Sequence, residues 1–192
     1  LVFADTTARA DWVAADLLSQ LEHSEDAQAI FITTSRELAE KVRAEVRQQS
    51  IRLPRREIVR QSLKNSYILI TKTLEDTLTL INEYAPEHLE IISRDEARIT
   101  PRIINAGSVF LGPYSGEALG DYATGSNHTL PTSGYAKMFS GLSAESFGKK
   151  VQMQKVSKKG FFDLAKTVEI LAECEGFTAH ANAVRIRDKN TL

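Results

Sequence analysis

Short apolar segments alternate with amphipathic helical segments along the chain from Leu1 to Leu111. The strand-like segments are Leu1–Ala4, Ala29–Thr33, Tyr67–Thr71, His88–Ile92 and Ser108–Leu111. Helical patterns fill the intervals at Arg9–His23, Glu37–Gln49, Arg55–Leu63, Leu74–Tyr84 and Ala97–Ile104. Strands and helices that alternate at this spacing are typical of α/β proteins. We therefore expect a mostly parallel sheet with helices on both faces.

The pattern changes after Gly141. Val151–Val156 alternates like an edge strand, and Phe161–Glu175 and Thr178–Arg187 have helical patterns. One strand and two helices bury too little apolar surface for an independent core. We assign residues 1–142 to the α/β domain and residues 143–192 to a small α+β tail that must pack on another surface.

Composition excludes several classes of protein. The 24 Lys and Arg residues nearly balance the 25 Asp and Glu residues, and no basic stripe with aromatic residues is present, so nucleic acid is not an expected partner. The longest apolar runs are far too short to cross a membrane, so no membrane association is expected. The single cysteine, Cys174, cannot form an internal disulfide, which suits a cytoplasmic protein.

Residues 105–134 contain six of the ten glycines and two of the five prolines. This density rules out a long helix, because interior Gly and Pro both destabilise helices. The strand Ser108–Leu111 leads into this loop, and Asp121, Asn127 and His128 follow among the glycines. The pattern predicts a site at the carboxyl end of the strand. A solvent-exposed loop whose polar residues form turns is the alternative.

The four histidines each have polar neighbours. Gln20 and His23, three residues apart in a helical pattern, project from one side of its last turn. Two histidines, a carboxylate and an amide oxygen can bind zinc. The spacing matches no compact metal motif, so a structural role for each histidine remains the alternative.

Glu87 and His88 follow the sequence Tyr84-Ala85-Pro86. Proline restricts the turn, so the carboxylate and the imidazole are held in fixed orientations where the next strand begins. Such a pair can divide general acid and base work near neutral pH. The alternative is a turn that ends the helix and exposes two polar residues.

Four segments resemble histidinol dehydrogenase, and the resemblance spans nearly the whole chain. They are DLLSQLEH (Asp16–His23), YAPEHLEI (Tyr84–Ile91), INAGSVFLGPYSGEALGDYATGSNHTLPT (Ile104–Thr132) and TAHANAV (Thr178–Val184). The resemblance implies oxidation of L-histidinol to L-histidine through histidinal, with NAD and bound zinc, at the end of histidine biosynthesis. It also implies part of an incomplete Rossmann-like sheet and an intertwined homodimer.

The resemblance also implies roles for individual residues. Its metal ligands match Gln20, His23, Asp121 and His180, with His180 reaching across from the second subunit. Its acid–base pair matches Glu87, which would activate water, and His88, which would take the alcohol proton. The substrate-binding positions match Gln20, His23, His88, Asp121, His128, Glu175 and His180.

The chain begins LVFAD, with an apolar strand and no methionine, and proteins of the resembled family are roughly twice as long. We interpret the chain as the C-terminal half of such an enzyme. The NAD-binding part would precede Leu1, and no G-x-G-x-x-G fingerprint appears here. We expect the piece alone to fold as a dimer through its tail but to make no NADH. Two other readings are a zinc hydrolase with Glu87 as base and a non-catalytic dimerisation module.

Overall fold

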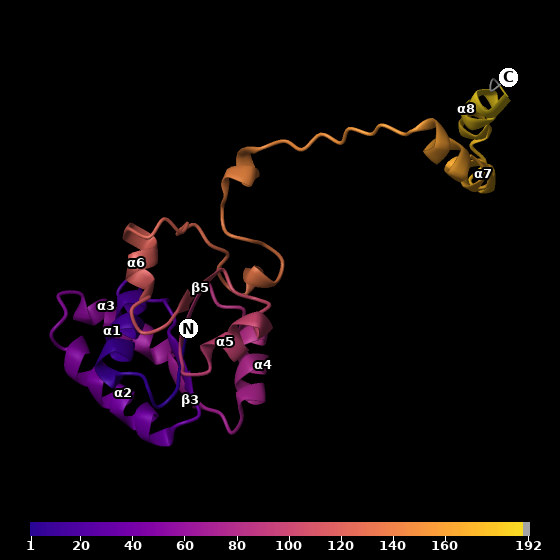
Figure 1. Cartoon of the computed structure of the whole chain (residues 1–192). Coiled ribbons are helices and arrows are strands. Elements are labelled where there is room, and N and C mark those ends of the chain that lie inside the picture. Colours follow the sequence, from indigo (N-terminus) through magenta and orange to yellow (C-terminus); the bar gives the residue numbers. More distant parts are fainter. Residues whose placement is uncertain (190–192) are drawn as a thin grey trace. The chain divides into compact units, whose positions relative to one another are not determined.

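The computed structural model describes residues 1–189. It divides into two compact units, Leu1–Phe147 and Gly148–Leu192, and the last three residues of the second unit lie outside the described part. The first unit contains every strand of the described chain (Figure 1).

The first unit is built on a parallel sheet. Its strands are β1 (Val2–Ala4), β2 (Ile30–Thr33), β3 (Tyr67–Ile70), β4 (His88–Ile92) and β5 (Ser108–Leu111). The strand order is β3-β2-β1-β4-β5, and every neighbouring pair is parallel. Val2 of β1 is paired with Phe31 on one side and with Glu90 on the other. The expected α/β class with a mostly parallel sheet is confirmed.

Helices cover both faces of the sheet. They are α1 (Ala10–Leu21), α2 (Arg36–Ser50), α3 (Arg56–Ser62), α4 (Leu74–Tyr84), α5 (Glu96–Ile99) and α6 (Glu117–Tyr122). Short 3₁₀ turns are at Leu63–Asn65, Thr100–Arg102, Tyr135–Lys137 and Ala144–Phe147. In Figure 1, α1, α2 and α3 lie on one side of the strands and α4 and α5 on the other. The helix expected at 97–104 is shorter because Pro101 lies in a 3₁₀ turn and Ile103 is extended.

Two apolar clusters form the core, one on each face of the sheet. Phe31, Val13 and Leu17 belong to the cluster under α1 and α2. Leu89 and Ile91 of β4 belong to the cluster under α4, with Ile81. Because side chains alternate along a strand, His88 and Glu90 of β4 face the α1 side instead. One polar stripe therefore lies on the α1 side of an otherwise apolar strand.

The second unit consists of two helices in its described part. They are α7 (Lys158–Cys174) and α8 (Thr178–Lys189), and Ser157 caps α7 by accepting a hydrogen bond from the Gly160 amide (3.1 Å). The expected strand at Val151–Val156 is wrong, because these residues form no regular secondary structure. Within residues 1–189 this segment pairs with no strand, and Met153 is 94% exposed.

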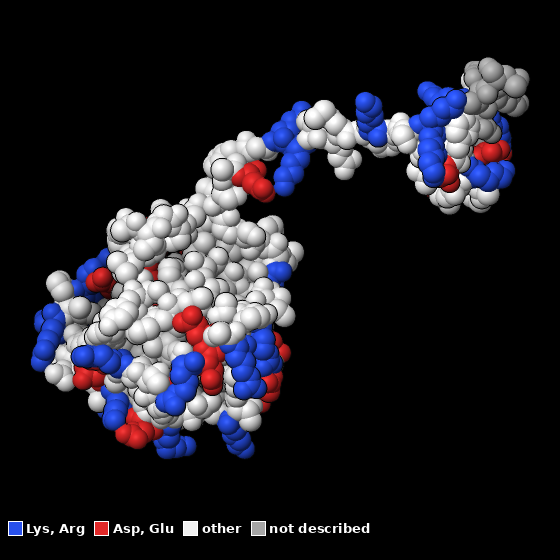
Figure 2. Space-filling model, in the orientation of Figure 1, with Lys and Arg blue, Asp and Glu red and all other residues white. Residues whose placement is uncertain are grey.

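In Figure 2, charged side chains of both signs lie mainly along the lower and outer margins of the first unit, and the central and upper part of the visible face is mostly uncharged. Across residues 1–189, none of the helices combines the length and the apolar character that a membrane span requires.

The buried position of Phe31 gives a direct test of the core. Replacing Phe31, which is fully buried in β2, by Ala should lower the free energy of unfolding by about 3–5 kcal/mol, because the cavity cannot fully collapse. The control is Ile51→Ala at an exposed position, which should change it by no more than about 0.5 kcal/mol. Chemical denaturation measures both values. A loss below about 1 kcal/mol for Phe31→Ala would show that β2 is not packed as described.

Candidate metal and acid–base site

The candidate site lies at the edge of the sheet where the parallel strands begin. His88 is the first residue of β4, and Gln20 lies in the last turn of α1. A helix that joins neighbouring parallel strands runs back across the sheet, so the end of α1 returns to this edge. The expectation of a site at the carboxyl ends of the strands is therefore wrong. The glycine-rich loop does leave β5 at the carboxyl edge, but α6 carries Asp121 back to His88.

The end of α1 supplies an amide and an imidazole. Oε1 of Gln20 lies 3.2 Å from Nδ1 of His88. His23 lies just beyond the last helical residue and is exposed. The Ser62 hydroxyl donates a hydrogen bond to the carbonyl of Leu21 (2.8 Å), which satisfies a group that the helix end leaves free. This contact holds the end of α1 in place beneath the site.

The turn before β4 fixes Glu87 and His88. Helix α4 is followed by its C-cap residue Ala85, which has a left-handed conformation (φ 53°) and donates its amide to the carbonyl of Ile81 (2.9 Å). Pro86 then directs the chain into β4. A Cβ atom on Gly107 would lie 2.5 Å from the carbonyl oxygen of Glu87, so only glycine allows β5 to approach this turn.

Helix α6 brings two carboxylates to His88. Nε2 of His88 lies 3.8 Å from Oε1 of Glu117 and 3.7 Å from Oδ1 of Asp121. The two acids are four residues apart and share one side of the helix. The helix packs closely on β5, because a Cβ atom on Gly120 would lie 2.3 Å from the ring of Phe110.

Sequence reasoning missed three acidic residues of this region, Asp16, Glu90 and Glu117. The Glu90 side chain accepts a hydrogen bond from the backbone amide of Glu117 (2.7 Å) and is 4% exposed as a residue. For Glu90 and Glu117, the spacing from a predicted site residue was the sequence signal that could have found them. Glu90 follows His88 by two residues in a strand, and Glu117 precedes Asp121 by four in a helix, so each pair shares a face.

Burial sets the protonation of these groups. It raises the pKa of Glu90 to about 8 and that of Glu117 to about 7, because an ionised carboxylate loses its hydration there. Burial likewise raises the pKa of Glu87, and the nearby Asp121 charge adds to this shift. Burial lowers the pKa of His88, which favours the neutral imidazole. The site therefore combines buried acids with a neutral base.

The donor atoms fit a divalent cation. Nε2 of Gln20, Nε2 of His88, Oε2 of Glu90 and Oε1 of Glu117 are buried and have no hydrogen-bond partner among the described residues. Potential ligand atoms of His23, Glu117 and Asp121 lie within 4.8 Å of one another. The clustered atoms of His23, Glu117 and Asp121 can bind a cation, whereas Nε2 of Gln20 is an amide NH2 group that can only donate hydrogen bonds. Imidazole and carboxylate ligands of this kind suit zinc.

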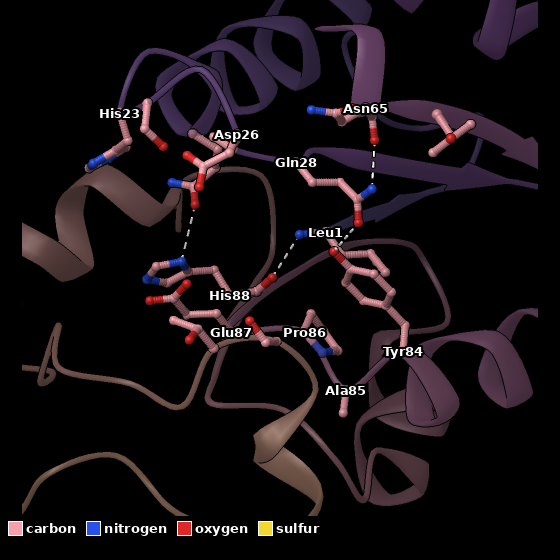
Figure 3. A pocket seen from close by; sticks show the side chains of 16 residues that line it. Leu1, His23, Asp26, Gln28, Asn65, Tyr84, Ala85, Pro86, Glu87 and His88 are labelled. Atoms are coloured by element: carbon pink, nitrogen blue, oxygen red, sulfur yellow. Dashed lines mark hydrogen bonds between the residues drawn. The ribbon is translucent and has the colours of Figure 1, made fainter. Parts of the chain in front are cut away.

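A pocket of about 690 Å³ opens beside this cluster. His23, Glu87 and His88 lie toward one end of it and Gln28, Asn65 and Tyr84 toward the other (Figure 3). At the far end the Tyr84 hydroxyl donates a hydrogen bond to Oε1 of Gln28 (2.8 Å), whose Nε2 donates to the carbonyl of Asn65 (2.6 Å). The pocket is large enough for a small polar metabolite beside the acid–base pair.

Three residues of the expected set are not among the residues that form this cluster in the first unit. His128 is exposed in the loop after α6 and does not line the pocket. Glu175 and His180 belong to the second unit, where His180 stacks on the ring of Phe177 (5.3 Å between centroids). Their contribution to the site stays a prediction.

The raised pKa values give a prediction for the metal-free chain. Between about pH 4.5 and pH 8 the folded chain binds more protons at Glu90 and Glu117 than the unfolded chain, so these groups make folding less favourable as the pH rises. The slope is at most about 1.4 kcal/mol per pH unit for each group. Glu90→Gln should remove its share, so the variant should lose less stability than the unsubstituted chain between pH 6.5 and 8.5.

Urea unfolding in the presence of a chelator measures this difference, with Glu83→Gln on the exposed side of α4 as the control. Comparing variants removes the opposing effect of His88, whose lowered pKa makes folding more favourable as the pH rises. Parallel pH profiles for Glu90→Gln and the unsubstituted chain would contradict the prediction.

Known proteins resemble this chain in sequence and in fold. The chain is 48% identical to histidinol dehydrogenase of Bacteroides thetaiotaomicron over 191 residues, which is all of this chain and 44% of that protein. It is 46% identical to the Escherichia coli K12 enzyme over 187 residues, 97% of this chain and 43% of that protein. The crystal structure of histidinol dehydrogenase from Elizabethkingia anophelis matches with a TM-score of 0.94 and 46% identity, covering 98% of this chain and 43% of that one.

The chain thus spans less than half the length of the curated relatives it matches. The family model for histidinol dehydrogenase matches residues 1–188, nearly the whole sequence. Together with the identities above, this match shows that the chain belongs to the histidinol dehydrogenase family.

Proposed function

We propose that this chain is the part of a histidinol dehydrogenase that holds the metal and the acid–base pair. The complete protein would oxidise L-histidinol to L-histidine through histidinal, in histidine biosynthesis in the cytoplasm. The observation that carries the proposal is the position of His88, whose two ring nitrogens face Gln20 on one side and the carboxylates of α6 on the other. Family membership supports the identity of the substrate.

The proposed metal is zinc. Gln20, His23 and Asp121 would hold it within the chain, and His180 would be contributed by a second copy in a homodimer. The clustered ligand atoms of His23 and Asp121 support this set, and Oε1 of Gln20 lies beside them, 3.2 Å from Nδ1 of His88. When bound, zinc would orient the polar groups of the substrate and stabilise negative charge on oxygen. Glu175 and His128 are proposed to contact the substrate as well.

His88 is the proposed base for the alcohol proton. Its lowered pKa keeps the imidazole neutral near pH 7, so a nitrogen lone pair is free to accept a proton. Loss of that proton from oxygen accompanies loss of hydride from the neighbouring carbon, and NAD is the proposed acceptor. The NAD site is proposed to lie in the part of the protein that precedes this chain.

Glu87 is the proposed activator of water in the second oxidation. Histidinal must add water to form a hydrate before it can lose a second hydride. A half-buried carboxylate with a raised pKa is suited to taking a proton from that water. Glu87 lines the same pocket as His23 and His88, which places it beside the proposed substrate.

Separate substrates test this division of labour. The test uses a complete protein in which this chain is joined to the N-terminal part of the Bacteroides thetaiotaomicron relative. His88→Asn should slow NADH formation from histidinol by ~10²–10⁴-fold, because it removes a general base. Glu87→Gln should slow the reaction of histidinal far more than the conversion of histidinol to histidinal. Glu83→Gln, an exposed change on α4, is the matched control.

Equal losses on both substrates for Glu87→Gln would contradict the assigned roles. The 192-residue chain alone should give no NADH, because the proposed cofactor site is not within it. Absence of activity in the joined protein, together with normal zinc binding, would count against histidinol as the substrate.

A further inference from the structure

We propose that Asn82 is a positioning residue for Glu87, and that its side chain holds the turn on which the second oxidation depends. The inference rests on the proposed role of Glu87 and adds to it a residue of α4 that the family resemblance does not assign. Asn82 does not line the pocket beside the acid–base pair, so it acts through the backbone and not on the substrate.

The Asn82 side chain holds the segment that leads into β5. Its Oδ1 accepts hydrogen bonds from the backbone amides of Ile104 (2.8 Å) and Asn105 (3.2 Å), and its Nδ2 donates to the carbonyl of Arg102 (3.0 Å). Nδ2 of Asn105 donates in return to the backbone carbonyl of Asn82 (2.9 Å). This carbonyl needs an outside donor, because the residue four positions later is Pro86, which has no N–H. Four hydrogen bonds therefore join the end of α4 to this segment.

The same segment continues into the turn that carries Glu87. The amide of Gly107 donates to the carbonyl of Pro86 (2.9 Å), and the amide of Ser108 donates to the carbonyl of Glu87 (2.9 Å). Gly107 follows Asn105 by only two residues, so the hydrogen bonds at Asn105 limit the movement of the backbone that contacts the turn. The end of α4 is therefore connected to the turn both along the chain and through the segment before β5.

Glu87 depends on this connection more than His88 does. His88 lies within β4, is paired with Ser108 and has its ring beside Oε1 of Gln20 (3.2 Å), whereas Glu87 precedes the strand. The turn also contains Ala85 in a left-handed conformation (φ 53°), which costs free energy in a residue other than glycine and persists only where neighbouring contacts maintain it. The direction of the Glu87 carboxylate is therefore sensitive to the contacts that hold the turn.

Hydrogen exchange of backbone amides, followed by NMR, tests the connection in the 192-residue chain itself. Asn82→Ala removes three of the four hydrogen bonds, so the amides of Gly107 and Ser108 should exchange at least about tenfold faster. The Tyr67 amide, at the β3 edge of the sheet, is the internal reference and should keep its rate. Glu83→Ala, an exposed change beside Asn82 on α4, is the control.

Kinetics of the joined protein test the consequence for the reaction. Asn82→Ala should lower kcat for histidinal by about 10- to 100-fold with KM nearly unchanged, because a misplaced catalytic group slows the chemistry more than it weakens binding. Oxidation of histidinol to histidinal and the zinc content should change little. Asn105→Ala removes only the hydrogen bond to the Asn82 carbonyl, so it should show the same pattern more weakly and serves as the test if Asn82→Ala does not fold.

Unchanged exchange at Gly107 and Ser108 would overturn the proposal, as would an unchanged kcat for histidinal. Equal losses on both substrates would also overturn it, because Asn82 would then support folding in general and not the position of Glu87. If the unsubstituted joined protein binds zinc but makes no NADH, the proposed function fails, and the exchange rates alone then decide whether Asn82 holds the turn.

Discussion

The hydrogen bond from the Glu117 amide to the Glu90 carboxylate connects the sheet to the site. Helix α6 has only six residues and no side-chain cap of its own, so it cannot be stable without such a contact. Glu90 supplies the acceptor from inside β4, on the same face as His88. Because His88 and Glu90 share a strand, the position of α6 relative to the imidazole is set by strand geometry. The positions of the two α6 carboxylates, Glu117 and Asp121, therefore depend on the Glu90 carboxylate as the hydrogen-bond acceptor.

Burying several acids near one another needs compensation. Desolvation raises the pKa of Glu90 to about 8 and that of Glu117 to about 7, so without a cation these two carboxyls tend to keep protons near neutral pH. It also raises the pKa of Asp16. A bound divalent ion would favour the ionised forms of these groups. Ionisation of these buried carboxyls destabilises the metal-free chain at high pH. A bound cation would offset that cost, which gives a reason for metal binding. The same carboxyl groups thus affect both the stability of the chain and its proposed metal binding.

Much of the fold could be predicted from the sequence, and the site only in part. Parallel strands appear as short apolar runs, so the buried strand β4 and the partly exposed edge strand β5 were predicted with the bounds that the structure shows. Apolar alternation alone was misleading at Val151–Val156, because a strand also needs a partner. The glycine-rich loop did not indicate that the site lies at the edge where the strands begin. Helix α6 runs back toward that edge, and its position depends on the close contact between Gly120 and Phe110, which the sequence does not show. Glu117 was missed because its importance comes from burial and from Glu90, which are properties of the folded chain.

The proposed metal centre is formed by the start of β4, the end of α1 and α6 together. Anomalous scattering at the zinc absorption edge, from crystals of the chain grown with zinc, locates the ion directly. We expect one strong peak within coordination distance of His23 and Asp121, beside His88. A zinc peak elsewhere on the chain, with His23 and Asp121 free of metal, would contradict it.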